Sequence, residues 1–182
     1  MCVPMDKLTK QQLSMVEETI EMAKKSDLLF RVGTVLFNSG IKVIGGCNKE
    51  GDTIYDPFGL PHNVCAIHAE MCVCMEYYQR FKKEIKSLRN IRKLVLCVVR
   101  YNHNGTIRNA KPCMECTNYL KKWFPCKIIY STDEGFVFSK ISNLLELHSD
   151  SLVPITFDLK ETENIEKIFN EIILVDEKLD AI

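Results

Sequence analysis

The chain has no long apolar run. None of its apolar stretches approaches the ~20 residues that a membrane helix needs, so we expect no contact with a membrane. Residues 1–10 contain one acidic and two basic side chains but no apolar signal core, and we therefore expect no secretion. Internal repeats and low-complexity linkers are also absent. At 182 residues the chain fits one domain with a full hydrophobic core, which we assign to residues 1–182.

The cysteines lack the pattern of a disulfide framework. Their number, nine, is odd, and six of them fall within helices or strands that the sequence predicts. This distribution is typical of a reducing compartment, where most thiols act as small buried apolar groups. We therefore expect a cytoplasmic protein.

The chain also has no net charge, but its charges are unevenly distributed. Residues 76–130 hold 13 basic and three acidic side chains, whereas residues 131–182 hold four basic and 12 acidic ones. Basic side chains concentrate in residues 80–93, which we call the basic extension. Such a run can mark a nucleic-acid site, or it can be a solvated helix face that the acidic C-terminal segment neutralises. We favour the second interpretation and expect no polynucleotide partner.

Two short motifs offer a set of reactive side chains. The first is H-A-E at residues 68–70, and the second is P-C-M-E-C at residues 112–116. Together they supply one imidazole, two thiolates with a two-residue gap, and a carboxylate near the imidazole. A catalytic Zn²⁺ takes three protein ligands and keeps a fourth position for water. Alone, C-x-x-C also occurs as a redox pair or as half of a structural zinc site, but the combination with H-x-E and a preceding proline is much rarer.

The first part of the chain predicts a helix followed by a β-hairpin. Apolar residues recur at three- and four-residue spacing over residues 9–25, as they do on one face of a helix. Residues 30–37 are rich in β-branched and aromatic side chains and predict a strand, which a turn at 38–40 connects to a second strand over 41–46. Residues 47–63 predict a loop.

The rest of the chain predicts alternating helices and strands. Residues 64–87 follow a helical pattern, with His68 in its first turns and Cys72 one turn later, about 6 Å further along the axis. We expect Cys72 to be a core residue rather than a metal ligand. The almost continuous apolar run at 91–101 predicts a strand buried on both faces, and N-H-N-G at 102–105 predicts a hairpin turn. The remaining expected elements are a helix over 113–124, strands over 127–132 and 136–139, helices over 141–148 and 161–178, and a short strand near 155–157.

The second motif lies at the expected start of a helix. Proline is tolerated at that position because its missing N–H costs nothing there. Free backbone N–H groups and the positive end of the helix stabilise negative charge on the thiolates of Cys113 and Cys116. With His68 near the start of the preceding helix, we expect two helix starts to converge on one metal.

This order of elements predicts an α/β fold. Helices that alternate with strands imply a mixed sheet between two helical layers, a three-layer α/β/α sandwich with five strands. The turn at 133–135 is so short that the strands on either side of it should be antiparallel. Residues 149–182 form a C-terminal extension that we expect to be helical.

The two motifs together resemble the signature H-x-E followed by P-C-x-x-C of zinc-dependent nucleobase deaminases. The chain also resembles the cytidine deaminase family over about residues 8–148. F-R-V-G at 30–33 resembles the family's F-x-V-G at the start of its first strand. G-C-N-K-E at 46–50 resembles its G-x-N-x-E after the second strand. The loop before the first motif and the gap between the motifs are longer here than is usual in the family.

The resemblance implies a cytidine deaminase-like fold and the hydrolytic conversion of cytidine or deoxycytidine to uridine or deoxyuridine, with release of ammonia. It implies a Zn²⁺ cofactor that His68, Cys113 and Cys116 bind. Glu70 would then carry protons between water, the base and the leaving ammonia.

The resemblance also implies how a nucleoside substrate is held. Asn48 and Glu50 would bind the sugar hydroxyls, Phe30 would lie against the pyrimidine ring, and backbone groups near Ala69 would hold the base. From the family we also expect a homodimer or a homotetramer.

Two other functions stay open on the sequence. A nucleotide deaminase of the dCMP type, or an RNA or single-stranded DNA cytosine deaminase, would use the basic extension. A non-catalytic zinc-binding module of the same fold would have no need of the proton carrier Glu70. Asn48 and Glu50 favour the nucleoside, because a site that encloses the 3′-hydroxyl leaves no exit for a continuing strand.

Overall fold

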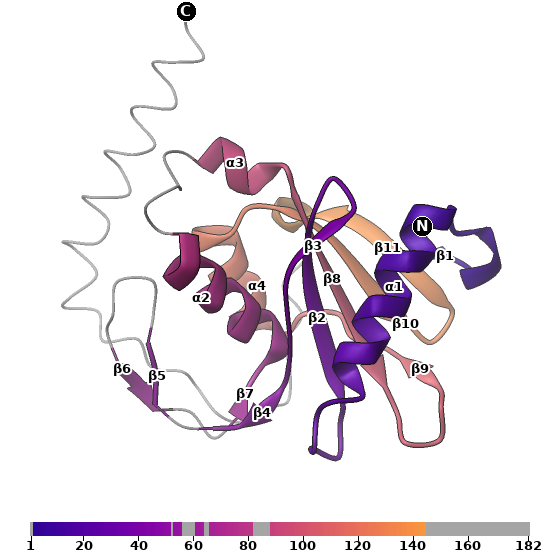
Figure 1. Ribbon diagram of the computed structural model, residues 1–182, viewed down its shortest axis with the longest axis horizontal. Helices are drawn as coiled ribbons and strands as arrows, with labels where there is room; N and C mark the ends of the chain where they lie inside the picture. The colour runs from indigo at the N-terminus through magenta and orange to yellow at the C-terminus, as the bar shows by residue number, and fades with distance from the viewer. Residues whose placement is uncertain (1, 52, 56–60, 64–65, 82–87, 145–182) are drawn as a thin grey trace, which may run out of the picture.

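A mixed sheet lies between two layers of helices (Figure 1). The computed structural model describes the chain in five segments: residues 2–51, 53–55, 61–63, 66–81 and 88–144. Helix α1 (Lys10–Ala23) covers one face of the sheet, and helices α2 (Ala69–Phe81) and α4 (Met114–Trp123) cover the other. The predicted α/β/α sandwich is therefore confirmed.

The sheet follows the order β1-β11-β10-β8-β2-β3, and β9 pairs with β8 as well. The bounds are β1 Cys2–Val3, β2 Val32–Asn38, β3 Ile41–Cys47, β8 Leu94–Tyr101, β9 Ile107–Arg108, β10 Lys127–Thr132 and β11 Gly135–Lys140. Strands β8 and β10 are parallel, and the other described pairs in this sheet are antiparallel. The five strands predicted before residue 144 are present, and the short strands β1 and β9 extend the sheet to seven. The antiparallel pairing of β10 with β11 is the one that the short turn predicted.

Helix α1 begins at a capping box and packs closely on β2. The Thr9 hydroxyl accepts the Gln12 N–H, and the Gln12 side chain accepts the Thr9 N–H, so two free donors are satisfied. At the other end the helix touches the sheet backbone. A Cβ atom at Gly33 would lie 2.4 Å from both the Ala23 nitrogen and the Thr19 oxygen, so only glycine allows this approach.

Side chains of β8 alternate between two hydrophobic cores. The core under α2 and α4 contains Leu94, Leu96 and Val98. The core under α1 contains Cys97 and Val99. The prediction of a strand buried on both faces is confirmed. The alternation also fixes which layer each end residue of the strand faces.

Residues 47–63 contain paired strands instead of the predicted continuous loop. Strand β4 (Lys49–Glu50) pairs with β7 (Ala66–Ile67), and β5 (Thr53–Tyr55) pairs with β6 (Pro61–Asn63). Strands of two or three residues are too short to show the alternation by which a strand is recognised in a sequence. Figure 1 shows that β7 leads directly into α2.

Helix α2 starts later than the sequence predicts. The pairing of β7 keeps Ala66 and Ile67 extended, and the helix begins at Ala69 rather than at Val64. His68 therefore precedes the helix, with its carbonyl accepting the Cys72 N–H at 3.1 Å. Tertiary pairing overrides the local helical pattern here.

Two further element boundaries differ from the prediction. Helix α3 (Leu88–Arg92) occupies the expected start of the buried strand, so β8 begins at Leu94. Five helical residues are too few to show a helical period. Near the other end, a 3-10 turn over Ile141–Asn143 stands where a longer helix was expected. A second 3-10 turn spans Met5–Lys7.

Several predictions fall on residues outside the described ones. These are the elements expected beyond residue 144, the C-terminal extension, and residues 82–87 of the basic extension. The single-domain assignment and the pairing of the basic extension with the acidic C-terminal segment stay predictions. Within its own helix, Arg80 pairs with Glu76. None of the helices that the structure describes has the length and apolar character for a membrane crossing.

Candidate metal centre and its surroundings

The structure brings His68, Cys113 and Cys116 together. Their ligand atoms all lie within 4.8 Å of one another. The His68 Nδ1 atom is 3.2 Å from the Cys116 sulfur and 3.4 Å from the Cys113 sulfur. Across the described segments, this is the one cluster of three such donors.

The spacing of the donor atoms fits zinc. Zinc–sulfur distances of about 2.3 Å and zinc–nitrogen distances of about 2.0–2.1 Å place the ligand atoms of a tetrahedral site about 3.6 Å apart. The two sulfur–nitrogen distances of 3.2 and 3.4 Å are close to that value. One imidazole and two thiolates are also the donor types that zinc prefers. Among the described residues the cluster holds three protein donors, the number that a catalytic zinc site uses.

The start of helix α4 stabilises a thiolate, as the motif predicts. Cys113 is the N-cap residue, and its sulfur accepts the Cys116 N–H at 3.4 Å. A hydrogen bond from the Cys116 side chain lowers the pKa of the Cys113 thiol to about 4, and His68 adds to this effect while burial opposes it. In the metal-free protein, Cys113 is therefore the ionised cysteine of the pair.

The other two donors carry protons in the metal-free protein. The hydrogen bond with Cys113 raises the pKa of His68 to about 9, although burial acts in the opposite direction. The hydrogen bond to Cys113, together with burial, raises the pKa of Cys116 well above its usual value. At neutral pH the cluster is thus an imidazolium, a thiolate and a thiol.

Two carboxyl groups lie beside the cluster. Glu70, in the first turn of α2, is only 5% exposed. Burial raises the pKa of its carboxyl, and the charge of His68 opposes that shift. Glu115, in the first turn of α4, has a carboxylate oxygen 3.6 Å from the Cys113 sulfur. Glu115 is not among the site residues predicted from the sequence, although its place inside the C-x-x-C motif was a signal.

Cys72 lies outside the donor cluster, as expected. It is half-buried and faces strand β3, where a Cβ atom at Gly46 would be 3.7 Å from the Cys72 Cβ. Burial raises the pKa of its thiol to about 11. A neutral thiol that packs on a strand is a poor metal ligand.

Asn48 holds the segment that carries Phe30. Its side-chain oxygen accepts the Val32 N–H at 2.8 Å, and its side-chain nitrogen donates to the Phe30 carbonyl at 2.7 Å. The Ser26 hydroxyl in turn donates to the Asn48 carbonyl at 2.9 Å. An asparagine amide has two donors and two acceptor positions, so one of each is left after these contacts. Asn48 thus fixes the position of Phe30 and keeps spare hydrogen-bonding capacity.

The other predicted substrate residues lie in different surroundings. The Phe30 ring is 56% exposed, and the Glu50 side chain is also exposed. Glu50 belongs to β4, whose partner β7 leads to His68. Ala69 is fully buried, at 0% exposed.

One side chain that the sequence analysis missed lies against Phe30. The guanidinium carbon of Arg100 is 4.4 Å from the centre of the Phe30 ring, a cation–π geometry. Arg100 is the first charged residue after the apolar part of β8. That change of character was the signal, but nothing local linked the residue to Phe30.

Comparisons with known proteins identify the fold. No protein-family model and no curated protein matches the sequence. Among solved structures, the fold is similar to the 1.6 Å crystal structure of cytidine deaminase from Burkholderia pseudomallei. The TM-score is 0.51 at 17% sequence identity, and the match covers 78% of this chain and 100% of that chain. The chain therefore has a cytidine deaminase-like fold, with a His/Cys/Cys cluster that can hold a metal.

Proposed function

We propose that this protein is a zinc-dependent hydrolase that removes the amino group of cytidine or deoxycytidine. The observation that carries the proposal is the three-donor cluster with a buried carboxyl, Glu70, two residues after His68. A structural zinc site uses four protein ligands and needs no proton carrier. The alternative of a non-catalytic zinc module leaves the buried carboxyl without a purpose, although burying it costs free energy.

His68, Cys113 and Cys116 would hold the metal. Zinc at this position supplies a Lewis acid that activates water at neutral pH. Glu70 takes a proton from the attacking water and delivers it to N3 of the cytosine ring. It then takes the second proton of that water from the hydroxyl group now on C4 and passes it to the amino group, which leaves as ammonia as the C4 carbonyl forms. Water and cytidine are consumed, and uridine and ammonia are formed. Burial of Glu70 keeps its proton from exchanging with bulk water during these transfers.

The proposed substrate contacts follow from the surroundings of the cluster. The exposed Phe30 ring offers a surface for the pyrimidine. Asn48 positions that ring, and its remaining donor and acceptor are offered to a sugar hydroxyl, as is the exposed carboxylate of Glu50. Backbone groups at Ala69 hold the base. A homodimer or homotetramer and a cytoplasmic location stay predictions from the sequence.

Ammonia release from a panel of compounds tests the proposal. The zinc-loaded protein is incubated with cytosine, cytidine, deoxycytidine, their monophosphates, adenosine and guanine. We expect ammonia from the cytosine nucleosides or nucleotides and much less from free cytosine, because a site that hydrogen-bonds a sugar rejects compounds without one. The absence of ammonia from every cytosine compound would contradict the proposal.

Two variants of helix α2 make the test specific. Glu70→Gln keeps the size and a hydrogen bond but cannot accept the proton, and we expect a loss of at least 10²- to 10⁴-fold in kcat. Glu76→Gln is the matched control, because Glu76 lies on the same helix and pairs with Arg80. It should keep its activity. A Glu70→Gln variant with more than about a tenth of wild-type activity would show that another group carries the protons.

A further inference from the structure

The stack of Phe30 on Arg100 lies at the same end of the sheet as the metal donors. Arg100 is near the end of β8, and its backbone N–H donates to the Ser131 hydroxyl at 3.2 Å. The Ser131 carbonyl accepts the Ala110 N–H at 2.9 Å, two residues before the proline that precedes Cys113. Ser131 therefore joins the backbone of Arg100 to the segment that delivers the cysteines.

The stack also lies on the same face of the sheet as the donors. In β8, Leu94, Leu96 and Val98 face the layer of α2 and α4. The alternation along the strand gives Arg100 the same orientation. Val32, which is paired with Arg100, packs against the same core. Because the donors lie at the starts of α2 and α4, Arg100 shares this face and this end of the sheet with them.

The positive charge of Arg100 has no carboxylate partner among the described residues. Its Nε atom is buried and makes no hydrogen bond, a condition that Arg31 shares. A buried charged donor without an acceptor costs more free energy than a neutral one. The cation–π contact with Phe30 holds the guanidinium plane in place, but a ring face does not accept the N–H bonds at the edge of that plane.

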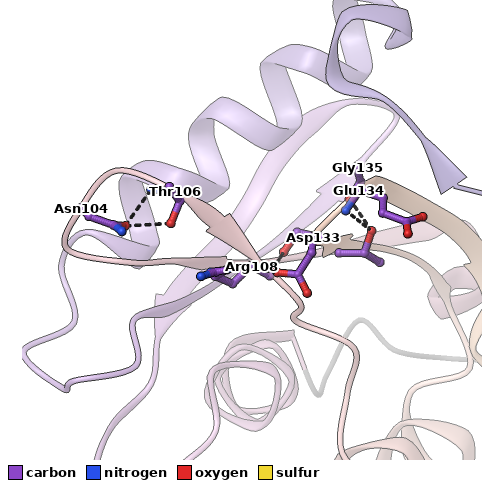
Figure 2. A network of polar contacts seen from close by, with 8 residues as sticks. Asn104, Thr106, Arg108, Asp133, Glu134 and Gly135 are labelled. Carbon is purple, nitrogen blue, oxygen red and sulfur yellow. Dashed lines mark hydrogen bonds and ion pairs between the residues drawn. The ribbon is translucent and has the colours of Figure 1, made fainter.

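A second cation makes the position of Arg100 more unfavourable. Arg108 of β9 is its direct partner in the antiparallel ladder, and like charges in that arrangement repel. Arg108 is neutralised by Asp133, at 3.3 Å between Nη1 and Oδ1 (Figure 2). Of this cross-strand pair, only Arg108 has a carboxylate within the structure described. The arrangement therefore favours the binding of an anion at Arg100.

We propose that Arg100 binds the 5′-phosphate of a cytosine mononucleotide. The inference rests on the proposed deaminase function and narrows the substrate class from nucleosides to nucleoside monophosphates. A guanidinium binds phosphate oxygens through two parallel N–H bonds, and the aromatic ring beside it accepts the base. A single strand would need a groove of several free cations along its backbone. In the pair of Arg100 and Arg108, one guanidinium lacks a carboxylate, and one phosphate is enough to satisfy it.

Kinetics with matched substrates test the proposal. The ratio of kcat/KM for cytidine 5′-monophosphate over cytidine is measured for the zinc-loaded wild type and for three variants. The wild-type ratio should exceed one. Arg100→Ala should lower kcat/KM for the monophosphate about 10- to 100-fold, mainly through KM, and change the value for cytidine less than about threefold. Arg100→Lys should recover part of the loss, because it keeps the charge but not the two parallel bonds.

Arg108→Ala is the control for a general change in charge. It removes a cation from the same pair of strands, but one that Asp133 already neutralises. Its ratio should stay close to the wild-type value. A wild-type ratio below one would overturn the phosphate site and leave the deaminase function intact. So would an Arg100→Ala variant in which kcat/KM falls equally for both substrates. Competition by single-stranded DNA that is stronger than by the monophosphate and weakens steeply with salt would also overturn it.

A binding measurement separates this inference from the proposed function. Calorimetry measures the binding of cytidine 5′-monophosphate to zinc-loaded Glu70→Gln and to the double variant that also carries Arg100→Ala. Inorganic phosphate serves as the competitor. Binding that Arg100→Ala abolishes supports the phosphate site even if no compound yields ammonia, in which case the deaminase function alone fails. Binding that is unchanged by Arg100→Ala overturns the site whatever the activity.

Discussion

Replacement of Asn48 by alanine should lower stability and activity together. The variant loses the hydrogen bonds of 2.8 Å to Val32 and 2.7 Å to Phe30. Each such bond contributes about 0.5–1.5 kcal/mol net, so the free energy of unfolding should fall by about 1–3 kcal/mol. At about 2–4 °C per kcal/mol for a chain of this size, Tm should fall by about 2–12 °C. Activity should fall too, because Phe30 is no longer held and the sugar loses a partner.

Thermal and urea unfolding of the zinc-loaded protein measure the first effect, and kcat/KM measures the second. The control is Asn118→Ala, which changes an exposed asparagine of α4. Alanine is the better helix former there, so Tm should stay equal or rise slightly. An Asn48→Ala variant with a wild-type Tm would refute the conclusion that the Asn48 hydrogen bonds hold Phe30 in position. A variant that loses stability but keeps full kcat/KM would refute the substrate role.

Metal content and its dependence on pH give two further predictions. Cys113→Ala should lose its zinc, whereas Cys72→Ala should retain one zinc per chain by elemental analysis; zinc retained in Cys113→Ala would contradict the ligand set. Zinc must displace one proton each from His68 and Cys116, whose pKa values are raised, but none from Cys113, whose pKa is about 4. Between about pH 5 and 8 zinc affinity should therefore rise about 100-fold per pH unit, as measured by competition with a chelator. A rise of about tenfold per unit would mean that only one donor is protonated.

The sheet was predictable because its main strands are long and apolar. The hairpin of β2 and β3 combines two seven-residue strands with a turn in which Ser39 and Gly40 have positive φ angles of 52° and 82°. Strand β10 begins and ends where the sequence predicts. Local composition determines these elements.

The metal donors were predictable for a different reason. Their residue types and spacing form a motif, and the motif is as visible in the sequence as in the fold. The boundary at Ala69 was not predictable, because it depends on the pairing of β7 with β4. Nor was the contact of Phe30 with Arg100, since 70 residues separate the two in the chain and no local pattern connects them.

The two helix starts that carry the donors are anchored to the rest of the fold independently. The pairing of β7 with β4 holds the start of α2, and the hydrogen bond from Ala110 to Ser131 holds the approach to α4. The connections between these anchors can therefore gain or lose residues without moving a donor atom. Each doubling of a flexible loop costs only about 0.6 kcal/mol. Insertion into the long loop or the basic extension is thus a route by which evolution can alter what the protein recognises while the chemistry at its centre stays the same.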